Sequence, residues 1–121
     1  QISGELAYKK NQENSIRLAK KIVENIADRL EMRNGGVHGA NFAVLRGFNG
    51  TGVLIELGFV SNSYDAEILV DAASQQKMAE EIAKSIREYF ELNKNKYTVI
   101  KSHGIQQNSA QSKVYNIGCM Y

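Results

Sequence analysis

One carboxylate stands where an apolar side chain is expected, in the stretch GVLIELGFVSN at residues 52–62. The run VLIELGF has the composition of a covered strand, and Glu56 lies near its end. An unpaired carboxylate is costly in a buried strand. Glu56 can pair with a buried Arg or Lys, lie in a binding crevice at the end of the strand, or act as general base on a metal-bound water. Its place just before Gly58 favours the last two roles.

The chain offers few metal ligands. Its two histidines are His38 and His103, and its single cysteine is Cys119. Neither histidine has a partner at the HxxxH or HExxH spacing of helical zinc sites. One thiol makes neither an internal disulfide nor a CxxC site. The sequence therefore predicts no metal site in this chain.

An amphipathic helix precedes the region of Glu56. In NSIRLAKKIVENIADRL, residues 14–30, apolar side chains recur at the three- and four-residue spacing of one helix face. Asn14 or Ser15 can cap its start. Residues 34–36, Asn-Gly-Gly, tolerate the left-handed backbone that ends a helix. A helix over these residues is therefore predicted.

Two strand candidates and two helices follow. ANFAVLR at residues 40–46 and VLIELGF at residues 53–59 are β-prone and are separated by a glycine-rich loop. Asn62 or Ser63 can cap a short helix, and Ser74 can cap a longer one. The order helix, strand, strand, helix, helix predicts an α/β fold. The apolar face of the longer helix is expected to comprise Met78, Ala79, Ile82, Ala83, Ile86, Tyr89 and Phe90.

Two strands are too few for a complete covered sheet, so strands are expected to be missing on the N-terminal side. We expect residues 1–92 to form the folded part and residues 93–121 a basic polar tail or linker, with a weak strand at residues 97–101. The net charge is +2, and residues 93–121 hold four lysines but no Asp or Glu.

Composition excludes two classes of partner. The basic residues do not cluster with aromatic side chains, so no nucleic-acid interface is expected. No run of about 18 apolar residues is present, so no membrane-spanning helix is expected.

Several motifs together resemble the zinc-dependent N-acetylmuramoyl-L-alanine amidases, the cell-wall amidase family of autolysins, sporulation hydrolases and phage endolysins. The resemblance covers roughly Ser3 to Leu92 and is most specific in the strand that carries Glu56. It rests on SGELAYKK (residues 3–10), NSIRLAKKI (14–22), FAVLR (42–46), VLIELGFVSN (53–62), Asp65, Leu69 and IREYF (86–90).

The resemblance implies a fold and a reaction. It implies an open mixed sheet with helices on both faces, of which this chain is the C-terminal part. It implies one zinc held by two histidines and a glutamate, with a second glutamate acting as general base on the zinc-bound water. That base maps to Glu56, and the bond cleaved is the amide between N-acetylmuramic acid and L-alanine. Zinc lowers the pKa of its water, so a nearby carboxylate can take the proton.

The ligands of the family lie upstream of the matched segments. Zinc is therefore expected in the complete family domain but not in this chain, which we expect to be inactive alone. Arg46 can bind the peptide part of the substrate or pair with Glu56. Asn62 is expected to be a helix cap rather than a substrate contact.

The alternatives to a hydrolase fragment are a non-catalytic remnant that binds the wall or a partner, and an unrelated small α/β domain with a structural Glu56. The family resemblance implies peptidoglycan as partner, and a location outside the bacterial cell, in the cell wall, or as a phage product released from its host. An exposed sheet edge would also favour self-association.

Overall fold

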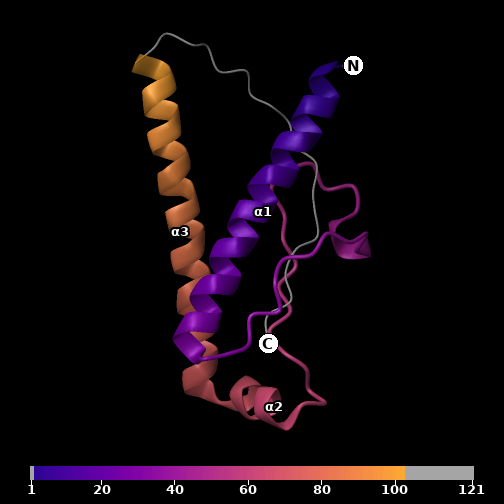
Figure 1. Ribbon diagram of the computed structural model, residues 1–121, viewed down its shortest axis with the longest axis vertical. Helices are drawn as coiled ribbons and strands as arrows, with labels where there is room; N and C mark the ends of the chain where they lie inside the picture. The colour runs from indigo at the N-terminus through magenta and orange to yellow at the C-terminus, as the bar shows by residue number, and fades with distance from the viewer. Residues whose placement is uncertain (1, 103–121) are drawn as a thin grey trace.

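Two long helices dominate the fold. The computed structural model describes residues 2–102 and the side chains of residues 4–94. Helix α1, Ile2–Leu30, packs against helix α3, Ala72–Ser102, and the two diverge at the end where α1 begins (Figure 1). The short helix α2, Ser63–Val70, packs on α3. The connection from α1 to α2 is long and contains only the single 3-10 turn η1, Ala43–Leu45.

The predicted open mixed sheet with helices on both faces is wrong. The described residues form helices and contain no strand. Residues 40–46 contain η1, and residues 97–101 belong to α3. Residues 53–59 are extended, but sheet-like pairing in the described part is confined to single positions at Asn34 and Glu56. A ladder needs successive pairs along two extended chains, and in the described residues the pairing does not continue beyond these single positions. Self-association therefore stays a prediction, without the sheet edge on which it was based.

Helix α1 begins twelve residues before the predicted start at Asn14. Its buried stripe continues the three- and four-residue spacing toward the N-terminus through polar side chains, which hid it from the hydrophobic pattern. Ser15 is not a cap but a fully buried residue of this stripe. The buried residues of α1 are Ala7, Asn11, Ser15, Leu18, Ala19, Ile22, Val23 and Ile26.

The end of α1 is set by a non-glycine residue. Glu31 has a φ of 54°, in the left-handed region. The Met32 amide then donates to the carbonyl of Ala27 at 3.0 Å, which is the long hydrogen bond of a Schellman motif. Met32 is buried in the core. The burial of the Met32 side chain offsets the free-energy cost of the left-handed backbone at Glu31. Helix α1 therefore ends before the predicted stop at residues 34–36.

The cap of α2 was predicted and that of α3 was not. The Asn62 side chain accepts a hydrogen bond from the Asp65 amide at 3.1 Å, which confirms Asn62 as the N-cap. For α3, Asp71 Oδ2 accepts hydrogen bonds from the amide and the hydroxyl of Ser74, both at 2.7 Å. These bonds hold the pKa of Asp71 below its ordinary value. The predicted cap at Ser74 is therefore wrong, because α3 already begins at Ala72.

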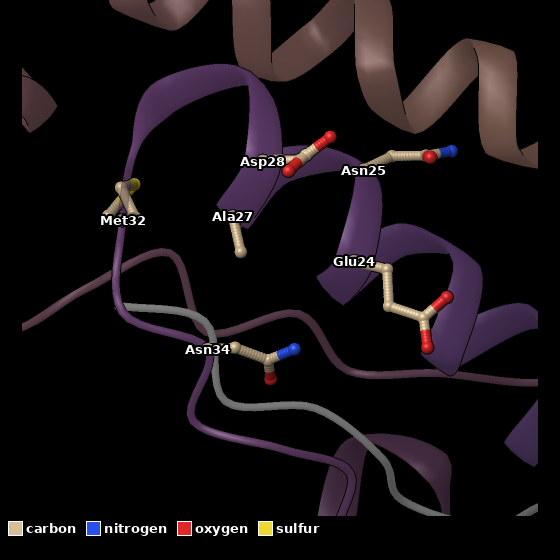
Figure 2. A pocket seen from close by; sticks show the side chains of 6 residues that line it. All are labelled: Glu24, Asn25, Ala27, Asp28, Met32 and Asn34. Carbon is tan, nitrogen blue, oxygen red and sulfur yellow. The ribbon is translucent and has the colours of Figure 1, made fainter.

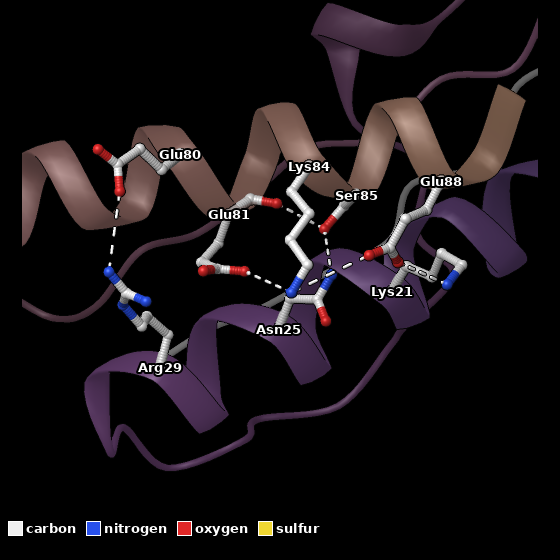
Figure 3. Close-up of polar contacts among 8 residues, drawn as sticks. All are labelled: Lys21, Asn25, Arg29, Glu80, Glu81, Lys84, Ser85 and Glu88. Atoms are coloured by element: carbon white, nitrogen blue, oxygen red, sulfur yellow. Dashed lines mark hydrogen bonds and ion pairs between the residues drawn. The ribbon is translucent and has the colours of Figure 1, made fainter. Parts of the chain in front are cut away.

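Polar contacts join α1 and α3 beside their apolar core (Figure 3). Lys21 pairs with Glu88 at 2.8 Å, and Arg29 approaches Glu80 at 3.9 Å. The central core comprises Leu18, Ile22, Val23, Ile26, Met32, Met78 and Tyr89.

The buried face of α3 is more polar than predicted. Glu81 and Ser85 are buried, whereas Ile86 and Phe90 are exposed. Only part of the predicted apolar face therefore lies against α1.

Within the part of the chain that the structure describes, no helix combines the length and apolarity that a bilayer crossing needs.

Candidate functional site

Glu56 lies on an extended segment, residues 51–58, that runs between η1 and α2. Val53, Ile55 and Leu57 are partly buried and pack against the core formed by α1 and α3. Side chains alternate between the two sides of an extended chain. Glu56 alternates with Ile55 and Leu57, yet it is half-buried like every other residue from 51 to 58. A half-buried carboxylate can accept a proton from a group that reaches it from solvent.

The upstream end of this segment is anchored to both long helices. The Gly52 amide donates a hydrogen bond to Oγ of Ser15 on α1 at 3.1 Å. The hydroxyl groups of Thr51 and Tyr89 lie 3.3 Å apart and join the segment to α3. Ser15 and Tyr89 are buried, so water competes weakly for these bonds.

The downstream end is anchored to α2. The Phe59 amide donates to Oδ2 of Asp65 at 2.9 Å. Gly58 has a φ of 149°, and a Cβ atom at this position would lie 3.2 Å from Cβ of Asp65. The turn therefore needs a glycine for its backbone angle and for its close approach to the aspartate.

Arg46 directly follows η1 and has an exposed side chain. Its Nε donates to Oδ1 of Asn41 at 3.3 Å. A long, exposed guanidinium held by one neutral partner has its remaining donors directed to solvent or to a ligand. The assignment of Arg46 to substrate binding stays a prediction.

The described residues do not fit the zinc site that the resemblance implies. No group of three or more His, Cys, Asp or Glu side chains among them could hold a metal ion. His38 is exposed, and its Nε2 lies 2.7 Å from the carbonyl oxygen of Gly35. His103 and Cys119 lie outside the described residues.

An acidic hollow of about 440 Å³ lies at the C-terminal end of α1 (Figure 2). Glu24 and Asp28 lie one helical turn apart on its wall, and the amide of Asn34 borders it from the following loop. Two nearby carboxylates favour cationic groups over anionic ones. Its lining residues are Glu24, Asn25, Ala27, Asp28, Met32 and Asn34.

The sequence indicated Glu56 but not the residues that hold its segment. Asp65 stands three residues after the cap Asn62, the spacing of the acidic partner in a capping box. That spacing was a usable signal. Ser15 lies four residues before Ala19 on the buried stripe of α1, and a polar residue at a core position also signals a buried hydrogen bond.

Comparison with known proteins gives a family for this chain. The family model described as N-acetylmuramoyl-L-alanine amidase matches residues 3–88. An uncharacterized protein of Bacillus subtilis, YqiI, is 39% identical over 79 residues, which cover 65% of this chain and 38% of that protein. No solved structure matches the chain significantly.

Two further relatives carry names. An uncharacterized cell wall amidase of Bacillus anthracis is 39% identical over 74 residues, 61% of this chain and 14% of that protein. The probable cell wall amidase LytH of Staphylococcus saprophyticus is 30% identical over 78 residues, 64% of this chain and 27% of that protein. The matched region thus spans less than two-fifths of the length of these relatives. Because the family model matches most of the chain, this protein belongs to the N-acetylmuramoyl-L-alanine amidase family.

Proposed function

We propose that this protein is a peptidoglycan hydrolase, acting on the amide between N-acetylmuramic acid and L-alanine, with Glu56 as general base. The family match over residues 3–88, which includes Glu56, carries the proposal. The anchoring of the segment that carries Glu56, at Gly52 and at Phe59, supports it. Two relatives are named as cell wall amidases, which supports action at the bacterial wall.

Glu56 would act by moving one proton. Its carboxylate takes a proton from the attacking water and returns it to the nitrogen of the leaving L-alanine. Such a positioned base contributes roughly 10²- to 10⁴-fold to the rate. Arg46, exposed 10 residues earlier in the chain, would bind a carboxylate of the stem peptide.

The zinc implied by the family resemblance is assigned to none of the described residues, because they do not fit it. The proposal places the ligands outside residues 2–102. We therefore expect hydrolysis to depend on added zinc and on groups that these residues do not supply.

The test measures new amino groups released from purified peptidoglycan, with and without zinc and with the zinc-binding part of a family member added, for the wild type and for Glu56→Gln. Glu67→Gln is the matched control, because Glu67 is an exposed glutamate on α2. Release that is lost in Glu56→Gln and kept in Glu67→Gln supports the proposal. Equal release by both variants would exclude Glu56 as the base.

A sedimentation assay with the same peptidoglycan covers the case without release. Binding without release favours a module that holds wall material without cleaving it. Neither binding nor release would refute action on peptidoglycan by this chain.

A further inference from the structure

Asp65 is a buried carboxylate to which the proposed reaction gives no role. It lies in the first turn of α2 and is 6% exposed. Burying a charged group is costly, so a buried aspartate needs strong hydrogen bonds in return. Its Oδ2 accepts the Phe59 amide at 2.9 Å, three residues after Glu56.

The usual role of an acid at this helix position does not explain Asp65. In a capping box, the third residue of the helix accepts the amide of the N-cap residue. Here the amide of the N-cap, Asn62, donates instead to the carbonyl of Phe59 at 3.0 Å. Asp65 reaches past the cap to the amide of Phe59 itself. The backbone amide of Phe59 is thus bound by Asp65 and its carbonyl by the amide of Asn62, so both polar backbone groups of this residue are held in the turn.

The close contact with Gly58 ties this turn to the segment of Glu56. Cβ, Cγ and Oδ2 of Asp65 would lie 3.2–3.4 Å from a Cβ at Gly58. The backbone therefore rests against the aspartate, and Gly58 can adopt its φ of 149° without a side-chain clash. Glu56 is separated from this contact by Leu57 alone.

The other end of the segment is already fixed, since Gly52 is bound to the buried Ser15. A short extended chain held at both ends has few ways to rotate. Gly58 is the flexible position next to the downstream anchor, and Glu56 is the ionisable residue that precedes it most closely in the chain.

We propose that Asp65 is a positioning residue for Glu56: its hydrogen bond to the Phe59 amide sets the direction in which the Glu56 side chain projects from the segment. This inference rests on the proposed role of Glu56 for its functional meaning. Its structural content can be measured without any turnover.

The experiment compares Asp65→Ala, Asp65→Asn and Asp71→Ala by NMR on the whole chain. Asp71 is the matched control, because it is also an aspartate at a helix start that accepts a backbone amide, but it is exposed and serves α3. The readouts are amide hydrogen exchange at Phe59 and the side-chain carboxyl signal of Glu56.

In Asp65→Ala we expect exchange at Phe59 to accelerate about tenfold, the effect of losing one good hydrogen bond, and the Glu56 signal to shift. Asp65→Asn retains an acceptor oxygen and should stay within about threefold of the wild type, an energy difference below that of one hydrogen bond. Asp71→Ala should change signals only around Ser74. If Asp65→Ala does not fold, Asp65→Asn decides. A Glu56 signal that shifts while amide exchange at Phe59 stays as in the wild type would show that the two are independent, and would overturn the inference.

An unchanged Phe59 exchange rate and Glu56 signal in Asp65→Ala would also overturn it. The proposed function is judged separately. If Glu56→Gln leaves peptidoglycan release intact while Asp65→Ala displaces Glu56, then the general base fails and the positioning stands. Where release is measurable, Asp65→Ala should lower kcat with little change in KM, and Asp65→Asn should restore it.

Discussion

The Ser85 hydroxyl on α3 accepts a hydrogen bond from the Asn25 side chain on α1, with 2.8 Å between Nδ2 and Oγ (Figure 3). Ser85 is fully buried and donates its own proton to the carbonyl of Glu81 at 2.6 Å. The hydroxyl is therefore used as donor and as acceptor. Together with the apolar core, the Asn25–Ser85 bond therefore helps to set the register of the two long helices.

Replacing Ser85 with Ala should lower the free energy of unfolding by about 1 kcal/mol, since the interhelical bond is lost and the Asn25 amide is left part-buried. Urea denaturation measures this change. Ser63→Ala, at an exposed serine on α2, is the control and should be close to neutral. Equal effects of the two variants would show that the Asn25–Ser85 bond is not made in solution.

The Lys21–Glu88 pair predicts a dependence of stability on pH. The hydrogen bond from Lys21, with the charges of Lys21 and Lys84, holds the pKa of the Glu88 carboxyl below its ordinary value of 4.5. A group whose pKa is lowered on folding stabilises the protein above its unfolded pKa. That contribution is lost as the pH falls below 4.5 and through the lower pKa of the folded state.

The check is the free energy of unfolding from pH 7 to pH 3 for the wild type and for Glu88→Gln. The variant should have a flatter curve below pH 4.5, and the difference should shrink with added salt because the pair is partly exposed. Glu91→Gln, at an exposed position on α3, should leave the curve unchanged. Parallel curves for wild type and Glu88→Gln would contradict the pairing.

Alanine substitutions at three glycines distinguish the cost of a positive φ from the cost of a steric contact. Gly58→Ala meets both a positive φ and Asp65, and should cost about 1–3 kcal/mol. Gly47→Ala has a φ of 80° but open space, and should cost about 1 kcal/mol. Gly4 lies in α1 with nothing near its Cβ position, so Gly4→Ala should stabilise the protein by about 0.5–1 kcal/mol.

Thermal denaturation of the three variants should give the lowest melting temperature for Gly58→Ala, an intermediate one for Gly47→Ala and the highest for Gly4→Ala. If Gly58→Ala cost no more than Gly47→Ala, the contact between Gly58 and Asp65 would carry no weight in solution.

Local signals in the sequence predicted local features. Asn62 was recognised as the cap of α2, because the capping residue and the bond it makes lie within four residues of each other. The apolar spacing at Ile22 and Ile26 likewise marked the buried face of α1. The family was also recognised, since its motifs are contiguous stretches.

Features that depend on distant partners were mispredicted. The run VLIELGF is β-prone, yet a strand requires a neighbour, and the neighbour is a property of the whole fold rather than of the run. Its apolar side chains instead pack on α1 and α3. For the candidate site, the sequence indicated Glu56 but could not indicate that Ser15, 37 residues from Gly52, holds its segment.

The buried face of α3, which includes Ser85 but not Ile86, gives a last prediction. Hydrophobic spacing placed Ile86 in the core, but it is 39% exposed, whereas Ile26 on α1 is fully buried. Ile26→Ala should lower the free energy of unfolding by about 2–5 kcal/mol, since it removes buried methyl groups and leaves a cavity. Ile86→Ala should cost less than about 1 kcal/mol, because its cavity is open to water and alanine favours the helix. Denaturant unfolding of the two variants side by side decides the matter: similar large losses would mean that α3 packs through its apolar face, with Ile86 inside and Ser85 displaced from α1.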